Sequence, residues 1–346
     1  MLMKVYVIHP MISSIEQLLK FLHMENTFDL TWDMEAPELL MASEWIYFKK
    51  EYFEQFKLLT ATAKIRVFLA LEAMSPDWNL FDYAIGYDNH LTNGDRFIRL
   101  ISPFDFFNSF VSTRENSITT LEQAKVELSR KTGFCNFLYS NSHAHPMRDK
   151  LFYAISEYKR VDSLGKHLNN VGQMGTGFAG HSMECVPLKS RYKFSIASEN
   201  AEYAGYTSEK LLTSLEAHTV PIYFGNPDIS EDINPKAFIN ASDFRTMDEL
   251  VDYVRKVDED DDLWCQYVLQ PWMLEDQMEH HEKRNVDYNQ KVISLLSGGG
   301  KRRLPQGTHV SNYRNAVLYR NYCMDIYRPT LKTRIKMFLR KMHLIR

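Results

Sequence analysis

The alternation of short apolar runs with helical segments is the feature that most limits the folds open to this chain. In the first 130 residues the strand-like runs include KVYVIHP, KIRVFLALE, FDYAIGYD and RFIRLIS. The second half repeats the alternation with FCNFLYSN, YKFSIASEN and VPIYFG, between helical segments such as MRDKLFYAISEY and EKLLTSLEAH. Strands that are separated by helices indicate mostly parallel sheets with helices on both faces.

The length of the chain predicts two such domains. Its 346 residues exceed the usual size of one domain. We expect one α/β domain over residues 1–130, a second over 131–296, and a linker with a tail over 297–346. Residues 297–308 are rich in glycine and basic residues, which predicts a flexible linker. Ligands of α/β proteins usually bind in a cleft, and we expect one between the two domains.

The charge of the chain is unevenly distributed along the sequence. The formal net charge is only -3, which gives no overall sign of a nucleic-acid partner. Residues 331–346 contain cations and no acid, with apolar residues recurring at spacings of three and four. This pattern is typical of a basic amphipathic helix lying on an anionic membrane surface. A terminal helix docked on the acidic body of the protein has the same pattern, and periodicity does not separate the two.

The cysteines and the apolar runs predict a cytoplasmic location. The 4 cysteines lie far apart without metal-ligand spacing, which is typical of buried thiols in a reducing compartment. The N-terminal run resembles a first strand rather than a signal peptide. No run approaches the ~20 apolar residues that a membrane span needs. We therefore expect a cytoplasmic protein, with peripheral membrane contact through residues 331–346.

A lysine in the first turn of an expected helix raises the question of function. The helix is expected to begin after Ser208, and a cation such as Lys210 is disfavoured there by up to ~1 kcal/mol. The preceding strand ends at Glu199 and Asn200, so polar groups gather where a parallel strand faces a helix N-terminus. Such a place suits an anion such as a diphosphate. The alternative is a surface lysine that points to solvent.

The segment around Lys210 resembles the α-1,3/4-fucosyltransferases, glycosyltransferase family 10. The family pattern runs approximately YKF-x-L-x-FEN, Y-x-TEK and TVPI-x-x-G, and residues 192–225 follow it in order. In the first half, RVFLALEAMSPDWNLFDYAIGYD is similar to the block GENESP-x-x-NLFDYAIGFD of bacterial members. Matching blocks extend from about residue 65 to about residue 255, which is far more specific than one short motif.

The resemblance implies a fold and a reaction. The fold is GT-B, in which two Rossmann-like α/β domains face each other across a cleft; the basic amphipathic helix would follow them. The reaction is an inverting transfer of L-fucose from GDP-fucose to a hydroxyl of an N-acetyllactosamine-like glycan, with an α-1,3 linkage expected and α-1,4 left open. We expect a bacterial-type enzyme that builds surface glycans such as lipopolysaccharide, and no obligatory metal ion.

The resemblance also implies roles for particular residues. Glu72 aligns with the proposed general base of the family and ends an expected strand. Arg148, at the start of another expected helix, and Lys210 would neutralise the leaving diphosphate, because an arginine fork suits phosphate oxygens. Further donor contacts are implied for Glu199, Asn200, Tyr206 and Glu209.

Two departures from the family pattern support alternative hypotheses. The chain reads LEAM where the bacterial block reads GENE, and Ser198 replaces the aromatic residue before Glu199. A GDP-sugar-binding scaffold without activity, or an enzyme for another deoxyhexose donor, would tolerate both changes. Because the proposed base and charge partners are retained, the sequence favours an active fucosyltransferase.

Overall fold

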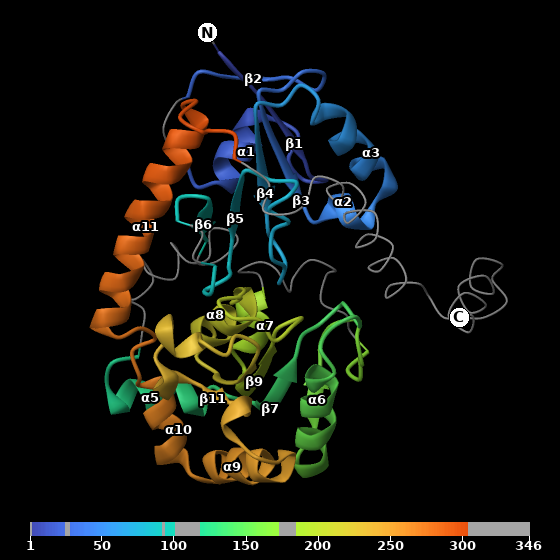
Figure 1. The fold of residues 1–346 in the computed structure, drawn as a ribbon. Coiled ribbons are helices and arrows are strands. Elements are labelled where there is room, and N and C mark those ends of the chain that lie inside the picture. Colours follow the sequence, from blue (N-terminus) through green and yellow to red (C-terminus); the bar gives the residue numbers. More distant parts are fainter. Residues whose placement is uncertain (1, 25–27, 92–93, 101–117, 173–184, 304–346) are drawn as a thin grey trace, which may run out of the picture. The chain divides into compact units, whose positions relative to one another are not determined.

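The computed structural model describes residues 2–24, 28–91, 94–100, 118–172 and 185–303, which are drawn in colour in Figure 1. The predicted C-terminal amphipathic helix, residues 331–346, lies outside this part of the chain. Contacts divide the chain into two compact units. Within the described residues, unit 1 combines Met1–Ala70 and Pro76–Ala84 with the segment that starts at Ile293, and unit 2 combines Leu71–Ser75 with Ile85–Val292.

The first sheet has, within the described residues, six strands in the order β2-β1-β3-β4-β5-β6. The strands are β1 (Met3–Ile8), β2 (Leu30–Trp32), β3 (Leu39–Ser43), β4 (Ile65–Leu69), β5 (Tyr83–Gly86) and β6 (Phe97–Arg99). β1 is parallel to β2 and β3, and β3 is parallel to β4. The connecting helices are α1 (Ile15–Phe21), α2 (Trp45–Phe48) and α3 (Lys50–Leu59). All five residues of β3 are buried, as is typical of a parallel sheet covered on both faces.

The second sheet lies in unit 2 and has the order β11-β10-β9-β7-β8 among the described residues. Its strands are β7 (Gly133–Phe137), β8 (Val161–Ser163), β9 (Tyr192–Ser198), β10 (Val220–Phe224) and β11 (Ile239–Asn240). All four strand pairs are parallel. The longer helices of this unit are α5 (Leu121–Ser129), α6 (Met147–Tyr158), α8 (Glu209–Glu216), α9 (Met247–Glu259) and α10 (Asp261–Val268). α11 (Glu275–Leu296) belongs to this unit up to Val292, and its end belongs to unit 1.

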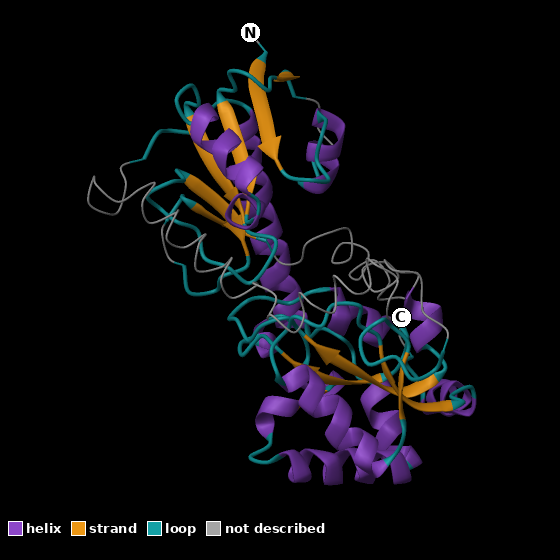
Figure 2. Cartoon of the chain, turned by 90° about the vertical axis from the view of Figure 1, so that its right-hand side faces the viewer, coloured by secondary structure: helices purple, strands orange, loops and turns teal. Residues whose placement is uncertain are grey.

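Both faces of the second sheet are covered by apolar side chains, because alternate strand residues point to opposite faces. Phe194 and Ile222 belong to a core cluster that includes residues of α5, α6, α9 and α10. Ala197 and Tyr223, of opposite parity on the same strands, belong to another cluster with residues of α8. Figure 2 shows strands with helices beside them in both parts of the chain. The prediction of parallel sheets with helices on both faces is therefore confirmed.

The glycine-rich segment that follows α11 is bonded to unit 1 where the structure describes it. The backbone N–H of Lys301 donates to the Tyr83 hydroxyl at 3.0 Å, and that of Arg303 donates to the Asp82 carboxylate at 2.9 Å. Arg302 also donates to the Ala63 carbonyl. Residues 301–303, where the composition predicts a flexible linker, are thus hydrogen-bonded to other residues of unit 1, and the buried carboxylate of Asp82 accepts one of these bonds.

Candidate active site

The carboxyl end of β9 and the start of α8 form the centre of the candidate site. Ser198 ends β9, and Glu199 and Asn200 follow it directly. The N–H of Glu199 donates to the carbonyl of Phe224, which ends the neighbouring parallel strand β10. α8 begins at Glu209, with Ser208 as its N-cap residue. The sequence predicted this start correctly, because the apolar helical pattern begins directly after a serine.

Lys210 is paired with two buried carboxylates. Its Nζ lies 3.4 Å from Glu199 Oε2 and 3.2 Å from Glu209 Oε1. Glu199 is fully buried, and Glu209 is only 4% exposed. The lysine is therefore explained by its neighbours, since a carboxylate is almost never buried without a partner.

Ser208 connects Glu199 to the start of α8. Its backbone N–H donates to Glu199 Oε1 at 2.9 Å, and its hydroxyl donates to Oε2 at 2.6 Å. The side chain makes no capping bond to its own helix; it bonds the buried carboxylate instead. Glu199 thus holds the helix end in place, and Lys210 donates to the same Ser208 hydroxyl at 2.9 Å.

The burial of this group shifts its ionisation. Burial raises the pKa of Glu199, while Lys210 and the bonds from Ser208 act in the opposite direction. For Lys210, burial lowers the pKa, but Glu209 and Glu199 together outweigh it, so that the pKa is raised. The lysine is therefore firmly protonated, and its charge is held close to the two carboxylates.

Gly225 is required beside Glu199. A Cβ atom at this position would lie 2.4 Å from Cγ and 2.6 Å from Cβ of Glu199. Any other residue here would push the carboxylate away from Ser208. The glycine that ends the VPIYFG run is thus explained by this close approach.

Arg148 lies in the first turn of α6 and is 1% exposed. Its Nη2 donates to the Ser198 carbonyl and to Asn200 Oδ1, both at 2.8 Å. The guanidinium lies over the ring of Tyr139, 4.1 Å from the ring centroid. The Tyr139 hydroxyl donates to the Ile196 carbonyl and accepts from the Ser198 N–H, which fixes the ring at the end of β9. The sequence gives no signal for Tyr139.

Glu72 is exposed, yet its carboxylate is held from one side. Its Oε2 accepts hydrogen bonds from the Tyr206 hydroxyl at 3.1 Å and from Asn200 Nδ2 at 3.3 Å. Tyr206 is 3% exposed, and its ring packs edge-on against Tyr87. Burial, followed by the negative charge of Glu72, raises the pKa of Tyr206, so that its hydroxyl keeps the proton that it donates.

The loop before Tyr206 is held by Gly205 and Asn226. Gly205 has φ +85°, and a Cβ there would lie 2.1 Å from the Tyr87 carbonyl oxygen. Its N–H donates to Asn226 Oδ1 at 2.7 Å, and Asn226 Nδ2 donates to the Thr207 hydroxyl. Asn226 is 2% exposed and was not predicted, because the short NP turn after β10 is not specific by itself.

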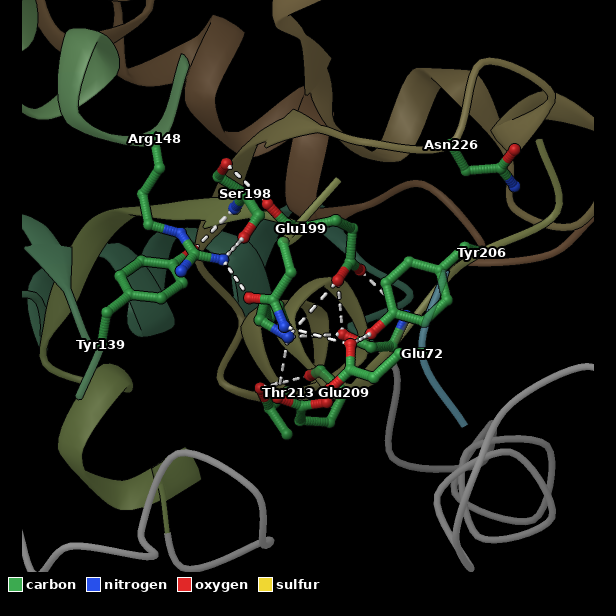
Figure 3. A network of polar contacts seen from close by, with 12 residues as sticks. Glu72, Tyr139, Arg148, Ser198, Glu199, Tyr206, Glu209, Thr213 and Asn226 are labelled. Atoms are coloured by element: carbon green, nitrogen blue, oxygen red, sulfur yellow. Dashed lines mark hydrogen bonds and ion pairs between the residues drawn. The ribbon is translucent and has the colours of Figure 1, made fainter. Parts of the chain in front are cut away.

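All seven residues that the sequence predicted for the site lie in unit 2. Figure 3 shows the network of polar contacts in which Glu72, Arg148, Glu199, Tyr206 and Glu209 take part. The seven residues form two bonded groups that meet at the Glu199–Asn200 peptide. One group contains Arg148, Asn200, Tyr206 and Glu72; the other contains Glu199, Glu209 and Lys210. The arrangement links an exposed carboxylate to a buried cation through Asn200, which suits proton removal near an anionic leaving group.

Among the residues that the structure describes, no group of three or more His, Cys, Asp or Glu side chains could hold a metal ion. No helix in that part of the chain is long and apolar enough to cross a membrane.

Comparison with known proteins identifies relatives of the chain. Residues 128–295 match the family model described as glycosyltransferase family 10 (fucosyltransferase), C-terminal part. The chain is 30% identical over 225 residues to the alpha-(1,3)-fucosyltransferase FucT of Helicobacter pylori, which covers 58% of this chain and 45% of that protein. It is 32% identical over 143 residues to an alpha-(1,4)-fucosyltransferase of Arabidopsis thaliana, covering 37% and 35%.

A third relative is GDP-fucose protein O-fucosyltransferase 3 of Homo sapiens, 29% identical over 178 residues, with 50% of this chain and 35% of that protein covered. The chain thus spans less than half the length of these three relatives.

Solved structures show the fold. A crystal structure of an alpha1,3-fucosyltransferase matches with a TM-score of 0.65 at 24% identity, covering 85% of this chain and 90% of that one. The same kind of enzyme with GDP matches with a TM-score of 0.62 over the same shares. The described part of the chain therefore has the GT-B type of α/β fold, as the sequence predicted.

Proposed function

The chain belongs to glycosyltransferase family 10 through residues 128–295, and from this we propose that it is an inverting fucosyltransferase. Its donor is GDP-fucose, and its acceptor is a hydroxyl of a GlcNAc-containing, N-acetyllactosamine-like glycan. Residues 131–296 bind the donor, and residues 1–130 supply the acceptor side.

The observation that carries the proposal is the carboxylate of Glu72, which is exposed while two donors hold its Oε2. In the proposed step Glu72 takes the proton of the acceptor hydroxyl, whose oxygen forms a bond to C1 of fucose. The bond between C1 and the diphosphate oxygen breaks, and its electron pair leaves with GDP. Because attack and departure occur on opposite faces of the sugar, the configuration at C1 inverts.

Positive charge near the departing diphosphate comes from Arg148 and Lys210 in this proposal. Both are held rigidly, so little reorganisation is needed as charge develops. Asn200, Tyr206 and Glu209 contact the donor. Glu199 is fully buried, so we assign it to holding Ser208 and Lys210. Fucosyltransferases of this family act without a required metal ion, and the proposed reaction needs none.

The proposal also specifies the glycosidic linkage and the cellular location of the enzyme. An α-1,3 linkage is proposed because the Helicobacter pylori relative, which matches over the most residues of the three, carries that name. The names of the other relatives make α-1,4 transfer and protein O-fucosylation the competing outcomes. We propose a cytoplasmic enzyme of bacterial surface-glycan synthesis, such as that of lipopolysaccharide or Lewis-type antigens, with peripheral membrane contact through residues 331–346.

The test offers labelled GDP-fucose with three acceptors in the presence of EDTA. N-acetyllactosamine has its GlcNAc 3-hydroxyl free, its β-1,3-linked isomer has the 4-hydroxyl free, and a folded protein domain offers serine and threonine. Transfer to N-acetyllactosamine supports the proposal, whereas transfer to another acceptor alone corrects the linkage. GDP-fucose binding without transfer favours the inactive scaffold, and transfer from another GDP-deoxyhexose alone corrects the donor.

A further inference from the structure

The side-chain amide of Asn200 joins the proposed base to a buried cation. Its Oδ1 accepts from Arg148 Nη2 at 2.8 Å, and its Nδ2 donates to Glu72 Oε2 at 3.3 Å. The orientation of the amide follows from these partners, since a guanidinium only donates and a carboxylate only accepts. A flipped amide would place Nδ2 against the Arg148 guanidinium, donor against donor, and Oδ1 against the Glu72 carboxylate, acceptor against acceptor.

The arginine end of this bridge is rigid. Arg148 is 1% exposed, donates to the Ser198 carbonyl as well, and lies against the Tyr139 ring. The backbone of Asn200 is held too, because its carbonyl accepts from the His145 N–H at 2.8 Å. The amide therefore presents Nδ2 to Glu72 from a fixed position.

At the glutamate end of the bridge, the hydrogen bonds to Glu72 converge on one of its two carboxylate oxygens. Tyr206 and Asn200 both donate to Oε2 of Glu72. Within the described residues, no hydrogen bond reaches Oε1. The exposed carboxylate is thus oriented through one oxygen, while the other faces no donor of the described chain.

We propose that Asn200 is a positioning residue that fixes Glu72 relative to Arg148. The base and the cation on the diphosphate side then keep one relative geometry during transfer. This inference rests on the proposed function, and it assigns to Asn200 a task besides donor contact. Other charged or titratable groups around this bridge are Tyr87, Tyr139, His145, Glu199, Tyr206, Glu209 and Lys210.

The test replaces Asn200 by aspartate, which has nearly the same shape. Asn200→Asp keeps the acceptor for Arg148 but turns the donor toward Glu72 into a negatively charged oxygen 3.3 Å away. Like charges at this distance favour the protonated form of Glu72. We expect the acidic limb of the kcat/KM profile for the acceptor to move to higher pH by about 1 unit. Asn141→Asp, the same change in an exposed loop, is the matched control and leaves the limb in place.

A second readout does not depend on turnover. The carboxyl ¹³C signal of Glu72, assigned by its loss in Glu72→Gln, is titrated in the wild type, Asn200→Asp and Asn141→Asp. A titration at higher pH in Asn200→Asp alone supports the bridge, even if the wild type transfers no fucose and the proposed function fails.

Equal titration of Glu72 in all three proteins overturns the inference and leaves the proposed function intact. Should Asn200→Asp fail to fold, Asn200→Ser takes its place. Losing the hydrogen-bond donor to Glu72 also favours the protonated form of Glu72, so its titration again moves to higher pH, by a smaller shift. An unchanged titration of Glu72 overturns the bridge.

Discussion

Lys210 Nζ lies 3.4 Å from Oε2 of Glu199, a carboxylate that is completely buried behind the start of α8. This contact explains a cation where the helix dipole disfavours one. The lysine balances Glu199 and Glu209, and these in turn keep it protonated close to the proposed diphosphate position.

The first prediction concerns the stability of this group. Lys210→Met leaves two buried carboxylates without their cation, and breaking such a pair costs about 3–5 kcal/mol in the free energy of unfolding. Urea denaturation measures the loss. Adding Glu199→Gln removes one of the stranded charges, so we expect the double variant to be more stable than Lys210→Met alone. The control is Lys150→Met on exposed α6 surface, with a change within about 0.5 kcal/mol. Equal losses in Lys210→Met and Lys150→Met would refute the charge balance.

The second prediction separates the ring of Tyr139 from its hydroxyl. Tyr139→Phe leaves the Ser198 N–H without its acceptor, at a cost of about 1–3 kcal/mol in stability, but keeps the ring under Arg148. Tyr139→Leu also removes the cation–π contact, which is worth about 2 kcal/mol when buried. Isothermal titration should show GDP binding nearly unchanged in the first variant and about tenfold weaker in the second.

Phe134→Leu is the control for this comparison. Phe134 belongs to the same core cluster and also lies under a cation, Lys159, whose side chain is half exposed and outside the candidate site. We expect a loss of stability without a change in GDP affinity. Weaker binding in all three variants would mean that the ring of Tyr139 has no specific effect on Arg148.

The third prediction is a pH dependence of stability. Burial lowers the pKa of His9 from 6.5 to about 4, where its Nδ1 accepts from the Met11 N–H. The unfolded chain binds a proton at this residue as the pH falls through 6.5, while the folded chain stays neutral until about 4. The stabilisation is therefore present above 6.5 and is lost as the pH falls toward 4.

The measurement compares the wild type with His9→Asn at pH 7 and pH 5. We expect the unfolding free energy of the wild type to fall by about 2 kcal/mol more than that of the variant between these values. Parallel behaviour of His9→Asn and the wild type would show that His9 is not held neutral in the fold.

Much of the site was predictable because it depends on local order along the chain. The segment MRDKLFYAISEY corresponds to α6, and the start of α8 at Glu209 follows from Ser208 and the apolar helical pattern. Polar groups at the carboxyl end of a parallel strand often face a helix N-terminus, so Glu199 and Asn200 were expected close to the start of the helix that carries Lys210.

Other features depend on contacts that a single sequence does not reveal. Glu199 bonds Ser208 and Lys210 because its side chain is buried where β9 ends. Tyr139 supports Arg148 from a loop with no motif of its own. The bond from the Arg303 N–H to the Asp82 carboxylate joins residues far apart in the sequence, so the composition of residues 301–303 gives no sign of it.

The most direct test of the account is the activity of Glu72→Gln in fucose transfer from GDP-fucose. The matched control is Glu202→Gln, the same change at an exposed residue of the loop between β9 and α8. We predict that kcat falls by about 10²-fold or more, as for a removed general base, with GDP affinity within a few-fold of the wild type. Glu202→Gln should retain full activity. Transfer by Glu72→Gln at a rate close to that of Glu202→Gln would contradict the assignment of Glu72 as the base.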